Sequence, residues 1–149
     1  YEEQGHPYHA SARLWDDAGR PKRALPHYEW LHKMHPGDVG VTARLGTLYA
    51  EVGEYQKARK LLSEARTEKP DNVRISLQLA EVYEQLGQID LADGIYASLM
   101  DAFPDKAGIL FRYAAFLERQ GKPDRAERMR DEAREKLPGV ERRDMRRLR

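Results

Sequence analysis

The chain has 149 residues, no cysteine, and 26 basic against 25 acidic residues, which give a formal net charge of +1. Without cysteine it can form neither disulfides nor thiolate metal sites, and the balanced charge argues against a dedicated nucleic-acid-binding protein, which usually carries a basic excess. The most apolar run, GILFRYAAFL at 108–117, is about half as long as a membrane-spanning helix and contains Arg112. No membrane span is therefore predicted.

Four segments of similar pattern follow one another along the chain, each 34 residues long. Three residue types recur at this interval in every segment: Gly19, Gly53, Gly87 and Gly121; Ala24, Ala58, Ala92 and Ala126; Pro36, Pro70, Pro104 and Pro138. Three such columns rarely coincide by chance, because glycine and proline are minor components of ordinary sequence. The sequence is therefore interpreted as an internal repeat with copies at 5–38, 39–72, 73–106 and 107–140.

Each copy predicts two amphipathic helices that meet near its glycine. In the second copy, Leu45 and Tyr49 precede Gly53 at helical spacing, and Ala58 and Leu61 follow it at the same spacing. Glycine suits the position after a helix, where the backbone often turns left-handed. The closing proline cannot continue a helix and is expected to end each unit.

Three positions depart from the pattern. Ser11 replaces a large apolar residue of the other copies, so the first helix of the first copy is expected to pack less firmly. Pro26 falls inside the second helix of that copy and predicts a kink or a late start. Arg130 replaces Tyr28 and its equivalents, so the last helix of the last copy is expected to face water or to be covered by another element.

A 34-residue unit of this composition, built as helix, turn and helix, resembles the tetratricopeptide repeat family. The resemblance covers residues 5–140 and implies an all-α fold, a right-handed solenoid of antiparallel helix-turn-helix repeats. Residues 1–4 are expected to end a preceding segment of a longer protein. Residues 141–149, ERRDMRRLR, form a basic segment that is expected to start a capping helix. Contact of this segment with anionic membrane or nucleic acid is the alternative.

The resemblance also implies a concave groove, lined by the first helices of successive repeats, in which family members hold segments of partner proteins. By the family pattern, the expected partner-binding positions are His9, Arg13, Arg44, Thr47, Arg74, Leu77, Gln78, Glu81, Phe111 and Arg112, with His6, Ala43 and Ala115 nearby. Asparagines that one family variant uses to hold chaperone tails are absent, because Arg13 and Thr47 occupy those places. Chaperone-tail binding is therefore disfavoured.

Each copy contributes one arginine to this expected groove, and arginine's forked donors suit the carboxylates or phosphates of an acidic partner. The alternative is that these arginines are solvated helix residues, offset by acidic residues of the same helices. Leu77 and Phe111 are the candidate apolar anchors, or they pack between adjacent repeats. Both pairs of alternatives remain open at this point.

Nothing in the sequence predicts catalysis. All five histidines lie in the first copy, and Glu29 with His32 has the Glu-x-x-His spacing of di-metal helical bundles. The other copies supply no matching ligands, and a protein zinc site normally needs three, so no metal site is predicted. Phosphate-binding loops, dinucleotide fingerprints and nucleophile elbows are missing. No cofactor is predicted either, and the chain is interpreted as non-enzymatic.

The leading hypothesis is a protein-interaction scaffold, part of a longer repeat protein, that holds a protein or peptide partner of acidic character. One alternative is the scaffold part of a bacterial machine for exopolysaccharide export or biosynthesis, which recruits an enzyme or a charged polymer. Another is a targeting module attached to a catalytic domain outside these residues. The compartment is undetermined, with the bacterial periplasm and the cytoplasm both open, and the sequence does not define the oligomeric state.

Overall fold

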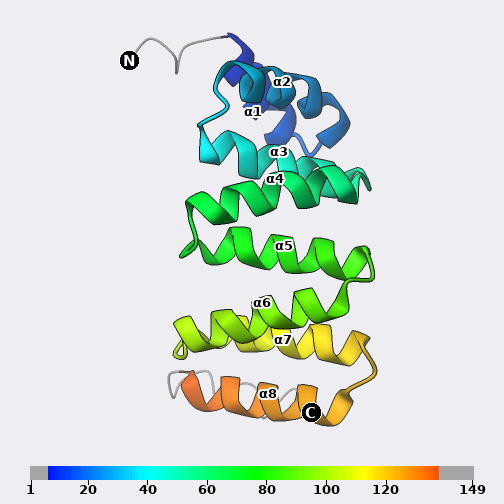
Figure 1. Ribbon diagram of the computed structural model, residues 1–149, viewed down its shortest axis with the longest axis vertical. Helices are drawn as coiled ribbons and strands as arrows, with labels where there is room; N and C mark the ends of the chain where they lie inside the picture. The colour runs from blue at the N-terminus through cyan, green and yellow to red at the C-terminus, as the bar shows by residue number, and fades with distance from the viewer. Residues whose placement is uncertain (1–6, 138–149) are drawn as a thin grey trace. The chain divides into compact units, whose positions relative to one another are not determined.

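The computed structural model describes residues 7–137, and these residues form eight helices and no strands (Figure 1). The helices are α1 (Pro7–Asp17), α2 (Pro21–Met34), α3 (Val39–Glu51), α4 (Tyr55–Glu68), α5 (Val73–Gln85), α6 (Ile89–Ala102), α7 (Ala107–Arg119) and α8 (Pro123–Lys136). Each of the four repeat copies contains one pair of these helices, joined by a short turn. The fold is an all-α helical-repeat solenoid, as the sequence predicts.

The described residues fall into two compact units, 7–92 and 93–137, and the boundary lies inside α6. The core of the first unit consists of Ala12, Ala24, Tyr28, Leu31, Val41, Leu45, Leu48 and Leu61. In the second unit, the buried rings of Tyr96, Tyr113 and Phe116 pack together, with the centroids of Tyr96 and Tyr113 5.2 Å apart. A smaller cluster of Ala107, Leu110 and Ala133 adjoins Met100, Phe111, Met129 and Leu137.

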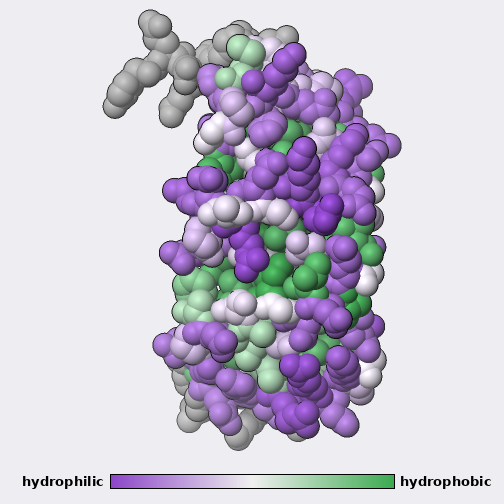
Figure 2. All heavy atoms as spheres, viewed as in Figure 1, coloured by the Kyte–Doolittle hydropathy of each residue, from purple (hydrophilic) through white to green (hydrophobic). Residues whose placement is uncertain are grey.

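Polar side chains cover most of the face shown in Figure 2, and hydrophobic surface gathers at the height of α5. None of the described helices has the length and apolar character needed to cross a membrane. The apolar residues instead form contacts between helices. On α4, for example, the buried residues Ala58, Leu61, Leu62 and Ala65 recur at helical spacing and so lie on one face.

The repeated glycine is required by the backbone of the turn inside each repeat. The φ angles of Gly19, Gly53, Gly87 and Gly121 are +64°, +85°, +73° and +73°, and no other described residue has a positive φ. After α3, the Glu54 N–H donates to the Tyr49 carbonyl at 2.8 Å and the Gly53 N–H donates to the Ala50 carbonyl at 3.1 Å. These bonds satisfy carbonyls that the end of the helix leaves without partners. The prediction for this column is confirmed.

The repeated alanine marks close approach between helices. Ala24, Ala58, Ala92 and Ala126 are each fully buried, with 0% of their surface exposed. On α3 the approach is closer still, because a Cβ added to Gly46 would lie 2.9 Å from Cγ of Leu62, which is itself fully buried. Side chains larger than hydrogen or methyl would therefore force the paired helices apart.

Prolines begin α2 and α8, at Pro21 and Pro123, where the missing N–H has no helical partner to lose. Of the two outcomes expected of Pro26, the late start is wrong, because α2 runs from Pro21 through Pro26 to Met34.

The closing Pro138 and the segments 1–4 and 141–149 lie outside the described residues. The looser packing expected from Ser11 stays a prediction.

Arg130 is held by ion pairs within its own repeat. Its guanidinium contacts Glu118 on α7 and lies 3.4 Å from the Glu127 carboxylate on α8. In the first repeat, the Tyr28 hydroxyl donates to Asp16 at 3.2 Å across the same separation of 12 residues. An acidic residue on the first helix thus accepts a hydrogen bond from a donor on the second, and arginine replaces tyrosine as that donor in the last repeat.

Replacing Gly53 with alanine is expected to lower the free energy of unfolding by about 1 kcal/mol, because a side chain disfavours the left-handed backbone of this turn. Gly37→Ala is the matched control, since an added Cβ there meets no atom within 4 Å and its backbone is not left-handed. Urea unfolding followed by circular dichroism measures both variants. Equal losses would show that the left-handed turn is not the cause.

Candidate partner-binding groove

A groove of about 450 Å³ lies between α3 and α5, the first helices of the second and third repeats. We call it the α3–α5 groove, and its lining residues are Val39, Gly40, Ala43, Arg44, Thr47, Lys69, Asn72, Arg74, Ile75 and Gln78. All of them belong to the first unit of the chain. The groove is therefore built by two neighbouring first helices and the turn between α4 and α5.

Matching N-terminal caps define where the two walls of this groove begin. The Asp38 carboxylate accepts from the Val41 N–H at 3.1 Å and begins α3, and the Asn72 side chain accepts from the Ile75 N–H at 3.1 Å and begins α5. These are the cap residues that helices prefer. The two starts are 34 residues apart, and two pairs of equivalent positions, Gly40 with Arg74 and Arg44 with Gln78, are among the lining residues.

The lining of the α3–α5 groove is cationic. It contains Arg44, Lys69 and Arg74 and no acidic residue. Lys69 and Arg74 are exposed, and within residues 7–137 no acidic side chain pairs with either of them. Both walls include residues from the first turn of their helices, where the helix dipole adds partial positive charge. This arrangement favours an anionic occupant.

Arg44 differs from the other two cations because it is already bound. Its Nε donates to Asp16 Oδ2 at 2.6 Å and its Nη2 contacts Asp16 Oδ1, so α3 is joined to α1 by a two-pronged ion pair. Its Nη1 lies 3.6 Å from Glu51. The hydrogen bond to Asp16 raises the pKa of Arg44 above its ordinary value, although burial opposes this. Arg44 therefore supports the fold as well as lining the groove.

Four of the expected binding residues meet in this groove, namely Arg44, Thr47, Arg74 and Gln78. Leu77 does not line the groove. Only 9% of its surface is exposed, which agrees with the alternative that it packs between helices rather than anchoring a partner. Glu81 and Arg13 are exposed at other places on α5 and α1. His9 is half-buried on α1, with its ring centroid 6.4 Å from that of His35.

The remaining two expected residues belong to the second unit. Phe111 on α7 is half-buried against the cluster that contains Leu110 and Ala133, so most of its ring is used in packing. Arg112, next to it, is exposed. Sequence reasoning missed five lining residues, namely Val39, Gly40, Lys69, Asn72 and Ile75. Lys69 and Asn72 lie in the turn before α5, whereas the family pattern directs attention to the first helices themselves, and their position immediately ahead of α5 is the signal that would have found them.

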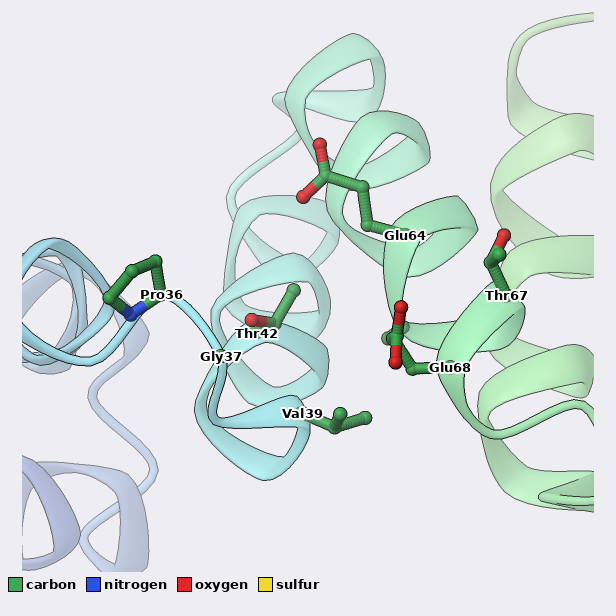
Figure 3. Close-up of a pocket in the computed structure, with 8 residues that line it drawn as sticks. Pro36, Gly37, Val39, Thr42, Glu64, Thr67 and Glu68 are labelled. Carbon is green, nitrogen blue, oxygen red and sulfur yellow. The ribbon is translucent and has the colours of Figure 1, made fainter.

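A second groove, also of about 450 Å³, lies between the start of α3 and the end of α4 (Figure 3). Its lining includes Val39 and Thr42 on α3 and, from α4, Glu64 and Glu68, whose side chains face α3 in Figure 3. The charge here is opposite to that of the α3–α5 groove. Two carboxylates at the C-terminal end of a helix lie at the negative end of its dipole, so this surface does not favour an anion.

The histidine motif forms no metal site among residues 7–137, where no group of three or more His, Cys, Asp or Glu side chains is placed to hold a metal ion. His32 Nδ1 lies 3.2 Å from the Thr42 hydroxyl, which donates to the Asp38 carbonyl at 3.0 Å. Glu29 instead accepts a hydrogen bond from Tyr49 at 3.0 Å. Both members of the Glu-x-x-His pattern thus join α2 to α3.

Tyr113 is the centre of a polar network in the second unit. It is 1% exposed, its hydroxyl donates to Asp93 at 2.6 Å, and Arg125 donates to the same hydroxyl at 2.7 Å. Burial raises the pKa of Tyr113 to about 12, and the hydrogen bond and charge of Asp93 act in the same direction. Burial together with Asp16 likewise raises the pKa of Tyr28 to about 12. These tyrosines therefore keep their protons at neutral pH.

Family models of the tetratricopeptide repeat match residues 17–66 and 49–99, and another match covers 77–139. The chain belongs to the tetratricopeptide repeat family. It is therefore of the class of helical-repeat scaffolds that bind proteins, a class that is generally non-enzymatic. These matches give no support to a role in exopolysaccharide export. A comparison with curated protein sequences finds no match.

Solved structures of MamA are similar to this chain. MamA from Desulfovibrio magneticus RS-1 is 16% identical with a TM-score of 0.78, and the similarity covers 87% of this chain and 73% of that one. MamA AMB-1 is 26% identical with a TM-score of 0.70, over 86% and 76% of the two chains. A further crystal structure of MamA is 21% identical with a TM-score of 0.73, over 84% and 73%. These similarities support the fold described above.

The raised pKa of Tyr113 predicts a loss of stability in alkali. Its folded pKa lies above the ordinary value of 10, so the folded chain holds this proton more tightly, and the resulting stabilisation is complete below pH 10 and lost as the pH rises toward 12. Tyr113→Phe is expected to reduce that loss while costing about 1 kcal/mol at neutral pH for the missing hydrogen bonds. Urea unfolding at about pH 8 and about pH 11 tests this.

Tyr55→Phe is the matched control for this experiment, because the Tyr55 hydroxyl has no hydrogen-bond partner among the described residues. Its free energy of unfolding is expected to match that of the wild type at both pH values. An equal change in the two variants would mean that the Asp93 and Arg125 contacts do not produce the alkaline effect.

Proposed function

We propose that this chain is a non-enzymatic scaffold that holds an acidic segment of a partner protein in the α3–α5 groove. The observation that supports the proposal is the pair of cations Lys69 and Arg74, for which residues 7–137 provide no acidic partner, in a groove whose lining has no acidic residue. Such cations can form charge-assisted hydrogen bonds with carboxylates, the strong type of hydrogen bond at protein surfaces.

The apolar residues of the groove fit the same kind of partner. Val39, Ala43 and Ile75 line it alongside the cations, and Asn72 and Gln78 supply amide donors and acceptors. A volume of about 450 Å³ is within the range of small-ligand sites, so it accommodates a few side chains of an extended segment rather than a folded domain. Such a segment would place apolar side chains on Ile75 and its neighbours, with acidic side chains near Lys69 and Arg74.

Reversing both free charges, with Lys69→Glu and Arg74→Glu, is expected to weaken binding of an acidic probe by at least about tenfold, because attraction becomes repulsion. The probe is a synthetic heptapeptide of alternating aspartate and alanine, titrated into the isotopically labelled chain and followed by NMR. Lys22→Glu, on exposed surface outside the groove, is the control. Unchanged affinity in the double variant, or equal loss in the control, would contradict the proposal.

Location is tested separately with a photo-crosslinker. Since the chain contains no cysteine, Gln78→Cys supplies a single attachment point inside the groove, and Gln56→Cys supplies one on exposed surface of α4. The same heptapeptide is expected to crosslink from the first position and not from the second. Crosslinking from both, or only from the second, would place the binding surface elsewhere.

A further inference from the structure

The α3–α5 groove is lined by three cations, and one of them, Arg44, already has an acidic partner within the described residues. Arg44 lines the groove and at the same time donates from two nitrogens to the Asp16 carboxylate. The side chains of this pair are 25% and 16% exposed, so they are only partly screened by water. The guanidinium therefore has two possible anionic partners, one inside the chain and one in the groove.

We infer that Asp16 competes with the bound partner for Arg44, so that this internal ion pair limits the affinity of the groove. The inference rests on the proposed function of the groove. A carboxylate that enters next to Arg44 must either share the guanidinium with Asp16 or displace it. While Asp16 holds Arg44, most of the positive charge on the α3 side is neutralised, and the groove attracts acidic side chains mainly from the side of Lys69 and Arg74.

The contacts around Asp16 indicate that displacement is feasible. The Tyr28 hydroxyl also donates to Asp16 Oδ2, at 3.2 Å, so this carboxylate keeps a hydrogen bond when Arg44 leaves. Arg44 likewise has a second acidic neighbour, because its Nη1 lies 3.6 Å from the Glu51 carboxylate. Each charge therefore keeps a polar neighbour, which lowers the cost of opening a partly buried ion pair.

Asp16→Asn is expected to raise the affinity of the groove for the aspartate–alanine heptapeptide by about threefold, the effect of a modest ion pair. Asp17→Asn is the matched control, because it removes the same charge from the neighbouring exposed residue, for which no contact with Arg44 is seen. The double variant Asp16→Asn, Arg44→Gln is expected to lose the gain. NMR titration measures all three chains.

Several results would overturn this inference while leaving the proposed function intact. If the peptide binding depends on Arg74 but Asp16→Asn and Asp17→Asn raise the affinity equally, the gain is only the removal of a distant negative charge. If the double variant Asp16→Asn, Arg44→Gln keeps the raised affinity, the gain again does not depend on Arg44. If no variant binds the peptide, and the wild type does not either, the proposed function itself fails.

The stability of the variant is measured in parallel. Asp16→Asn removes an ion pair between α1 and α3, and circular dichroism with urea unfolding shows whether the first repeat remains folded. Should it unfold, the labelled wild-type chain decides the question, because the competition requires that a peptide carboxylate reach the Arg44 guanidinium that Asp16 holds. The NMR signal of the Arg44 Nε–H is expected to shift as the peptide is added, and an unchanged signal at saturating peptide would contradict the competition.

Discussion

Close approach of the two helices in each repeat is the constraint on which the rest of the structure depends. It requires a residue with little or no side chain at fixed positions, and these positions hold the fully buried alanines of the repeated column and Gly46, which faces Leu62 on α4. When the helices approach this closely, the larger apolar residues beside the contact are buried as well. The left-handed glycine after each first helix then returns the chain in a single turn.

This frame leaves the polar positions free to vary, and the chain uses them in two ways. Some polar residues join helices, as Asp16 does by accepting from both Tyr28 and Arg44, and as Tyr113 does with Asp93 and Arg125. Others, namely Lys69 and Arg74, have no acidic partner among residues 7–137 and give the α3–α5 groove its charge. Arg44 belongs to both groups, and this double role connects the packing of the first repeat with the chemistry of the groove.

The architecture was predictable in detail, whereas the groove was predictable only in part. The positive φ of Gly53 and the burial of Ala58 follow from residue type and period alone. The positions of Arg44 and Arg74 on groove-lining faces follow from the family pattern. Lys69 was missed because its part in the lining depends on how the turn before α5 is directed. For Pro26, where a kink or a late start was expected, the late start did not occur, because one lost hydrogen bond does not outweigh the packing of α2 by Tyr28 and Leu31.

The sequence by itself determined the repeat length, the all-α class and the residues that pack, because these depend on local backbone preferences and on apolar periodicity. Tertiary structure alone decided which charges cancel. Arg44 and Arg74 are both expected to line the groove, yet of the two only Arg44 lies within hydrogen-bonding distance of an acidic residue from another repeat in the described part of the chain. That difference arises from a contact between residues 28 positions apart, and such contacts depend on the relative placement of α1 and α3 rather than on spacing along either helix.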